Sequence, residues 1–286
     1  PAQGQLVFSN HEEAALVRPV LEQTRCHALS LSIVTALIAE RTGEWHPVVA
    51  ELARSQLTGV RATLSVSMIR LTDVACREAF KALSILPANI LVGFHVLERL
   101  WRPLLDGRGC IEGEAGSHPA TTHENSGGGV HPDVIRHVGA LARVGLLRRS
   151  VATGKVVGVV LHPVICDYSR CLLSADGGRA AHQRLLDNYA DGSPTDGVDE
   201  HGWRDYAFWA TPDDGYWYDN VARHAAGSGN VCALVSLTCD EWRDARVRTA
   251  SPIAQQVDIE RVIEALQEVV DDSDQDARTT SVLHGI

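Results

Sequence analysis

The sequence predicts a mainly α-helical protein, in which a helical bundle is followed by a winged-helix domain with a small β-hairpin and then by an α-helical array. Three observations predict this class. Apolar residues recur at helical spacing along most of the chain. Two short apolar runs, the second of them β-branched, flank a turn at residues 152–155. Helical spacing then resumes directly after His162. We therefore expect three domains, over residues 1–59, 60–177 and 178–286.

The first domain reads as a helical bundle. An apolar stripe at helical spacing runs through residues 28–39. Pro47 fits the first turn of a following helix, because the N–H group that proline lacks would have no partner there. The helical pattern resumes from Ala62, at the start of the second domain, and Asp73 is placed to cap a further helix.

The second domain has the pattern of a winged helix. A short helix is expected from Phe94 to Leu100, ending near Pro103. Another helix is expected over 132–145, because Pro132 suits a helix start and Gly145 suits a helix end. A β-hairpin is then expected over 146–161, with its turn at 152–155.

The sequence of the third domain predicts an array of helices and is rich in tryptophan. Gly177 and Gly178 predict a break in the chain near its beginning. The acidic stretch 271–276 predicts a solvated linker. Between them we expect helices over residues 214–226, 229–247 and 256–270.

Composition and charge limit the classes of function. The 286 residues are 45% hydrophobic and 22% charged, which is typical of a soluble globular protein. The net charge of −10 argues against a general nucleic-acid binder, whose affinity depends on many Lys and Arg contacts to phosphate. No apolar stretch approaches the roughly 20 residues of a membrane-spanning helix.

The seven cysteines show no disulfide-like spacing. We expect them to be reduced and buried, as in a cytoplasmic protein. The chain begins with Pro1 and has no basic-then-apolar signal pattern, so we expect a piece of a longer protein.

A phosphate-binding loop is the first motif to test. Gly154-Lys155 resembles its end, but the motif G-x-x-x-x-G-K-[ST] fails at Arg149 and at Val156. We therefore expect a hairpin turn here, and we expect no ATP hydrolysis by this chain.

A metal site is the second possibility. Residues 106–130 are rich in glycine and have no periodic pattern, which predicts a mobile surface loop. Potential ligands gather in and beside this loop, but none forms the C-x-x-C pair that is typical of structural zinc sites. A polar loop without a metal is the alternative. The candidate ligands are Cys110, His118, His123, His131 and His137.

A DNA-binding surface is the third possibility. Residues 131–150 contain four arginines and one acidic residue, Asp133. Such a basic patch on the reading helix of a winged helix can contact DNA, but in an acidic chain we favour an intramolecular docking face. The arginines are Arg136, Arg143, Arg148 and Arg149.

His162 stands where a β-branched run meets a helix start. A helix start favours anions, and an imidazole there can donate a hydrogen bond to a phosphate oxygen. The alternative is an ordinary corner residue with a structural role.

Four stretches together carry a resemblance to a known family. They are CHALSLSIVTALIAERTGEWHPVVAEL, AFKALSILPANILVGFHVLERLW, VGLLRRSVATGKVVGVVLHPVICDY and GYWYDNVARHAAGSGNVCALVSLTCDEW. In order and spacing they resemble the regulatory half of the NB-ARC (STAND) signalling ATPases. The chain is most similar to apoptotic protease-activating factor and its WD-repeat relatives.

The resemblance implies a cofactor and a residue that contacts it. In the family, the histidine of the motif L-H-D touches the β-phosphate of ADP and holds the inactive state; that residue is His162 here. Ala28 occupies the position of a family proline beside the adenine, and Gly145 that of a serine near the phosphates. The aspartate that follows the motif histidine is replaced by Pro163.

The resemblance also implies partners. ADP or ATP would be bound mainly by an upstream nucleotide-binding domain of the same protein, and this chain would close over ADP. Release of this chain from the closed state would permit self-oligomerisation and signalling. The helical array would lead to a downstream WD-repeat propeller. A membrane is not expected as a partner, and a nucleic acid only in the first rival function, a winged-helix transcription regulator. The second rival is a helical adaptor without nucleotide control.

Overall fold

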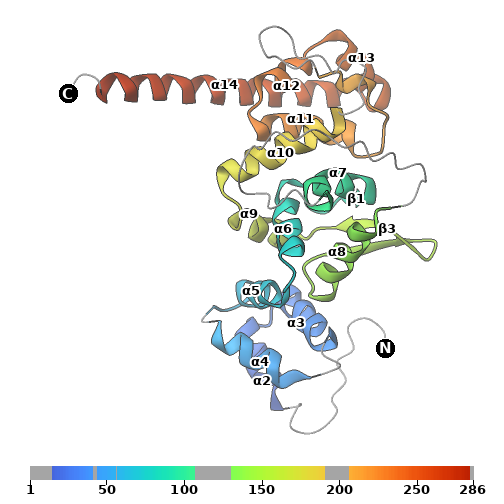
Figure 1. Ribbon diagram of the computed structural model, residues 1–286, viewed down its shortest axis with the longest axis vertical. Helices are drawn as coiled ribbons and strands as arrows, with labels where there is room; N and C mark the ends of the chain where they lie inside the picture. Colours follow the sequence, from blue (N-terminus) through green and yellow to red (C-terminus); the bar gives the residue numbers. More distant parts are fainter. Residues whose placement is uncertain (1–14, 41–43, 56, 107–129, 191–205, 284–286) are drawn as a thin grey trace. The chain divides into compact units, whose positions relative to one another are not determined.

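The computed structural model describes residues 15–40, 44–55, 57–106, 130–190 and 206–283, with side chains up to Asp271. The chain forms two compact units, Pro1–Ser174 and Ala175–Ile286. It is mainly helical and carries one small three-stranded sheet, which confirms the expected fold class (Figure 1). The division into three domains stays a prediction, and the glycine-rich loop lies outside the described residues except at its ends.

The first unit begins with a bundle of four helices, drawn in blue to cyan in Figure 1. Each of the four contacts the other three. The core holds Trp45, Leu37 and Val48, which are almost completely buried. Pro47 occupies the first turn of its helix, as expected. The helices are α2 (Val17–Thr24), α3 (Ala28–Glu40), α4 (Trp45–Arg54) and α5 (Val60–Arg70).

The rest of the first unit has the element order of a winged helix. Asp73 caps its first helix by accepting a hydrogen bond from the backbone N–H of Ala75 at 2.9 Å, as the sequence predicts. The elements are α6 (Val74–Ala82), the 3-10 turn η1 (Leu83–Ile85), β1 (Leu91–Gly93), α7 (Phe94–Leu105), α8 (Pro132–Arg143), β2 (Arg148–Ala152), β3 (Lys155–Val160) and α9 (Pro163–Cys171).

Two details of this region differ from the expectation. Helix α7 extends beyond Leu100 and ends at Leu105, two residues after Pro103. Because Pro103 lies in the last turn, its missing N–H removes only one backbone hydrogen bond. Strand β1 was not expected, and it makes the sheet three-stranded.

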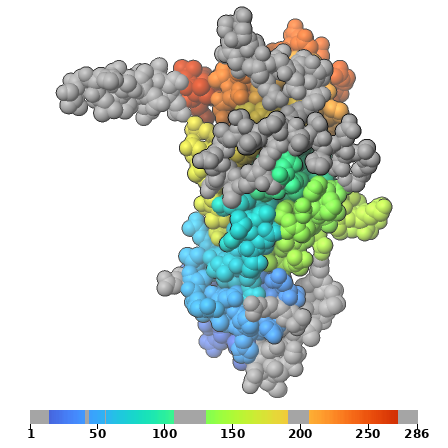
Figure 2. Space-filling view, viewed as in Figure 1, coloured from blue at the N-terminus to red at the C-terminus, as the bar shows by residue number. Residues whose placement is uncertain are grey.

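The sheet is antiparallel, with β3 in the centre between β1 and β2. Val159 of β3 pairs with Val92 on one side and with Arg149 on the other. The predicted turn is formed by Thr153 and Gly154, whose φ angles are 49° and 78°. Two consecutive positive φ angles are typical of a type I′ turn, which suits a tight hairpin. The tip of the hairpin projects from the first unit in Figure 2.

Gly158 lies where β3 approaches β1 most closely. A Cβ atom there would collide with the carbonyl oxygen of Val92 and lie 3.0 Å from the Leu91 side chain. We expect Gly158→Ala to lower the free energy of unfolding by about 1–3 kcal/mol, because one strand must shift. Urea unfolding followed by circular dichroism measures this loss.

The matched control is Gly139→Ala in helix α8. Apart from the adjacent residues and the backbone of its own helix, nothing lies within 4 Å of a Cβ at Gly139. Alanine has a higher helix propensity than glycine, so this variant should be as stable as the wild type or more stable by about 0.5–1 kcal/mol. Equal stability of the two variants would contradict the close approach of β1 and β3.

The second unit is an array of helices around aromatic side chains. Trp217 stacks on Tyr189 with ring centroids 4.0 Å apart and meets Phe208 edge-on at 5.3 Å. Tyr218 and Trp242 form a second stack. The elements are α10 (Ala175–Ala190), the 3-10 turn η2 (Phe208–Ala210), α11 (Trp217–Ser228), α12 (Val231–Ser236), α13 (Asp240–Thr249) and α14 (Pro252–Leu283).

Three expectations for this unit were wrong. Gly177 and Gly178 lie inside α10 and do not break the chain. The helix expected over 229–247 is two helices, because Cys239 adopts an extended backbone and caps α13. The acidic stretch 271–276 belongs to α14 rather than to a linker, since aspartate carries only a modest helix penalty.

Candidate functional site

His162 occupies the corner between strand β3 and helix α9. Its backbone is extended, with φ −75° and ψ 140°, and it is the N-cap residue of α9. The ring Nδ1 accepts a hydrogen bond from the backbone N–H of Val164 at 3.2 Å. The side chain is exposed, whereas Leu161 before it is buried. The structure thus holds the imidazole at the surface and fixes one of its two nitrogens.

This geometry defines which donors the corner can offer to an anion. Pro163 has no N–H, and the N–H of Val164 already serves the ring of His162. The N–H groups of Ile165 and Cys166 both donate to the carbonyl oxygen of His162. The backbone N–H groups of residues 164–166 at this helix start are therefore already paired within the chain, which leaves the imidazole as the donor to consider. Because Nδ1 accepts, the neutral ring carries its proton on Nε2, and that donor lies on the opposite side of the ring.

The other two expected nucleotide-contacting residues lie at helix α3. Ala28 is exposed and is the first residue of α3. Gly145 ends α8 with a φ of 75°, and a Cβ there would lie 3.1 Å from the Cα of Ile33 in α3. Glycine thus seats the end of α8 against α3. His162 begins α9, which packs on α5, α6 and η1 instead.

The basic patch is partly neutralised within the protein. Arg136 forms ion pairs with Asp73 and, at 3.0 Å, with Asp133. Arg143, Arg148 and Arg149 are exposed. An arginine that already holds two carboxylates is less available for DNA phosphate, so the patch is weaker than its sequence indicates.

The five metal-ligand candidates do not assemble as one set within the described residues. Cys110, His118 and His123 lie outside those residues. His131 is the N-cap residue of α8, and its Nδ1 accepts from the backbone N–H of Asp133 at 3.2 Å. His137 is buried and contacts a different residue, Cys76.

Cys76 and His137 belong to a polar cluster inside the first unit. The Sγ of Cys76 lies 3.0 Å from the Nδ1 of His137, and the Cys76 thiol donates to Oδ2 of Asp73 at 3.4 Å. Both Cys76 and His137 are only 1% exposed. Burial and the neighbouring carboxylate of Asp73 raise the pKa of the Cys76 thiol to about 11. The thiol is therefore protonated at neutral pH and is a poor nucleophile.

A second polar cluster lies inside the second unit. The Nδ1 atoms of His182 and His224 are 2.9 Å apart, and the Nε2 of His224 lies 2.8 Å from the hydroxyl of Tyr216. His224 is fully buried, and its burial, with His182 and Arg223 nearby, lowers its pKa well below the ordinary value. These residues form a hydrogen-bonded chain that joins α10 to α11.

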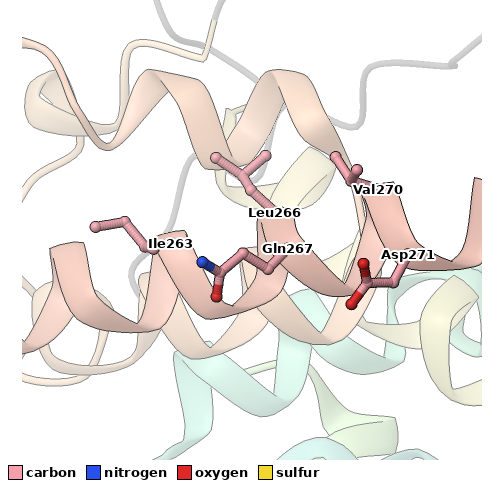
Figure 3. A pocket seen from close by; sticks show the side chains of 5 residues that line it. All are labelled: Ile263, Leu266, Gln267, Val270 and Asp271. Atoms are coloured by element: carbon pink, nitrogen blue, oxygen red, sulfur yellow. The ribbon is translucent and has the colours of Figure 1, made fainter.

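Helix α14 carries a shallow apolar hollow of about 480 Å³. Figure 3 shows its lining side chains, Ile263, Leu266, Gln267, Val270 and Asp271, all from this one helix. A surface formed by a single helix does not enclose a ligand, so the hollow is not a binding site by itself.

The cysteines only partly follow the expectation. Cys76 and Cys166 are buried and belong to no disulfide among the described residues, but Cys26 and Cys171 are exposed. None of the helices in the described part of the chain combines the length and apolar character that crossing a membrane requires.

The chain matches no protein-family model, and no curated protein matches it. The resemblance to NB-ARC proteins therefore stays a prediction that depends on the sequence motifs.

The cluster of Asp73, Cys76 and His137 was missed by the sequence analysis. Asp73 and Cys76 are three residues apart at a helix start, which places them on one face and is a readable local signal. His137 is 61 residues from Cys76 in the chain, and only the packing of α8 on α6 brings it to them.

Proposed function

We propose that this chain is the regulatory part of an ADP/ATP-switched signalling protein. It closes over ADP that an upstream nucleotide-binding domain of the same protein holds. When ATP replaces ADP, the chain is released and permits self-oligomerisation and signal transduction in the cytoplasm. The helical second unit leads to a downstream repeat propeller, and the chain itself performs no catalysis.

The observation that carries this proposal is the state of the His162 ring. An exposed imidazole with Nδ1 fixed by the helix presents one N–H donor in a defined direction. A hydrogen bond from such a donor to a charged phosphate oxygen contributes about 1.5–3 kcal/mol. The donor can therefore distinguish a nucleotide with a β-phosphate from one without it.

The departures from the family pattern are compatible with this role. Pro163 removes the aspartate that would cap the helix, but the ring of His162 supplies the cap itself. Gly145 cannot contribute a serine hydroxyl, and its position against Ile33 leaves little room for one. The contact with the β-phosphate of ADP then depends mainly on His162.

We expect His162→Asn to weaken ADP binding about tenfold or more in the natural protein that contains this chain. Asparagine preserves the cap, because its side-chain oxygen can accept the same backbone N–H, but it cannot place a donor where Nε2 lies. Isothermal titration calorimetry with ADP measures the change.

His131→Asn is the matched control. His131 is also an N-cap histidine that precedes a proline, and its Nδ1 accepts from the N–H two residues later at the same 3.2 Å distance. This variant should bind ADP as tightly as the wild type. Equal ADP affinity of both variants and the wild type would exclude a contact between His162 and ADP. It would favour the rival function, a helical adaptor without nucleotide control.

A further inference from the structure

We propose that Asp73, Cys76 and His137 bind one divalent transition-metal ion of the zinc class. Their ligand atoms, a carboxylate oxygen, a thiol sulfur and an imidazole nitrogen, all lie within 4.8 Å of one another. The site is separate from the His162 corner, and it does not depend on the proposed nucleotide switch.

The fold positions the three ligands on two packed helices. Asp73 is the N-cap residue of α6, and Cys76 lies one turn further on the same helix. His137 projects from the middle of α8, which packs against α6. Trp101 meets the His137 ring edge-on at 5.8 Å and donates from Nε1 to the carbonyl of Ala79 in α6 at 3.0 Å. These contacts fix the imidazole relative to the thiol.

The chemistry of the set selects the class of metal. A thiolate and an imidazole favour zinc, cobalt or copper over calcium and magnesium, which prefer oxygen ligands. An ionised Asp73 and a thiolate at Cys76 carry two negative charges, which a divalent ion neutralises. A neutral complex is the form that a buried site tolerates best. A water molecule completes a tetrahedral set of four ligands.

Binding requires only a small opening of the site. The Cys76 sulfur and the His137 nitrogen are 3.0 Å apart, whereas around one tetrahedral zinc ion they would be roughly 3.5 Å apart. The metal takes the place of the thiol proton, which is released to solvent. Arg136 gives up Oδ2 of Asp73 but keeps its ion pair with Asp133.

The alternative is a thiol–imidazole hydrogen bond that only stabilises the core. Titration of the chelator-treated protein with Co²⁺ separates the two, because a thiolate bound to cobalt gives a charge-transfer band in the near ultraviolet. We expect one Co²⁺ per chain, that band together with visible bands of a tetrahedral ion, and their loss when Zn²⁺ is added.

Three variants identify the ligands. Cys76→Ser should abolish the charge-transfer band. Cys166→Ser removes another buried thiol, on α9, and this variant should still show the charge-transfer band. Asp73→Asn preserves the helix cap, so it should remain folded while binding Co²⁺ at least tenfold more weakly.

A wild-type protein without the charge-transfer band overturns the proposal, and so does a band that survives in folded Cys76→Ser. If Cys76→Ser does not fold, Asp73→Asn decides: unchanged Co²⁺ affinity in that variant also overturns it.

Discussion

Arg246→Leu is expected to lower the free energy of unfolding of the second unit by about 3–5 kcal/mol. Arg246 donates from Nε to Asp258 and from Nη1 to Asp219, both at 2.9 Å. The side chains of Arg246 and Asp258 are only 6% and 3% exposed, whereas Asp219 is 69% exposed. Without the guanidinium, Asp258 becomes a buried carboxylate that has lost its hydrogen-bonded counter-charge, and only the more distant charge of Arg261 remains.

The burial of Asp258 already raises its pKa, and Arg246 acts in the opposite direction. Loss of Arg246 therefore raises the pKa of Asp258 further, and the variant must either bury a charge or take up a proton. The double variant Arg246→Leu/Asp258→Leu removes both groups, so it should be more stable than Arg246→Leu alone. A double variant as unstable as the single one would show that packing, not charge, dominates.

Arg243→Leu is the matched control on the same helix, α13. Arg243 pairs with Asp240 and Asp244, but its side chain is 50% exposed and both partners are more exposed still. Solvent screens exposed ion pairs, so this variant should lose little stability. Urea unfolding of all the variants provides the comparison. A loss for Arg243→Leu as large as that for Arg246→Leu would contradict the account.

Acidification below about pH 6.5, the ordinary pKa of histidine, is expected to lower the stability of the second unit through His224. Burial, His182 and Arg223 hold the pKa of His224 well below its ordinary value in the folded protein. In the unfolded chain the pKa is about 6.5. Above that pH neither state carries the proton, so the stability is fully present. Below it, only the unfolded state takes up the proton.

The resulting slope is about 1.4 kcal/mol per pH unit until the pH reaches the folded-state pKa. Urea unfolding at several pH values measures it. His224→Gln should have a shallower slope on the acid side, because it removes the titrating ring. Tyr216→Phe removes the hydroxyl that lies 2.8 Å from His224 but keeps the imidazole of His224 buried. This variant should therefore be less stable than the wild type and show the same dependence of stability on pH. Identical slopes in the wild type and His224→Gln would exclude His224 as the group responsible.

The elements that the sequence predicted well have strong local signals. Helix α8 begins at Pro132 and is followed by Gly145 at positive φ, so both of its ends were readable. The hairpin could be predicted because β-branched residues follow a turn that Gly154 makes possible. His162 could be placed at a helix start because a proline, which suits the first position of a helix, follows it.

The elements that were missed have weak local signals. Strand β1 is three residues long, too short to show alternation, and it forms because β3 pairs with it. The break between α12 and α13 contains neither glycine nor proline, and a cysteine cap such as Cys239 is a weak signal. That α14 continues through an acidic stretch follows from the modest helix penalty of aspartate, which a charge pattern does not show.

The candidate sites depend on distances that a sequence does not contain. The pairing of His162 with the N–H of Val164 decides which ring nitrogen faces solvent, and the spacing of the two residues alone does not reveal it. The contact between Cys76 and His137 joins helices far apart in the chain. Tertiary packing selects such partners from many residues of the same type.

We propose that His162 binds the β-phosphate of ADP, and a comparison of ADP with AMP tests this contact most directly. AMP lacks the β-phosphate but keeps the base, the ribose and the α-phosphate. Calorimetry of the natural protein should show that His162→Asn weakens ADP binding about tenfold or more and leaves AMP affinity unchanged. An equal change for both nucleotides, or no change for either, would contradict a contact between His162 and the β-phosphate.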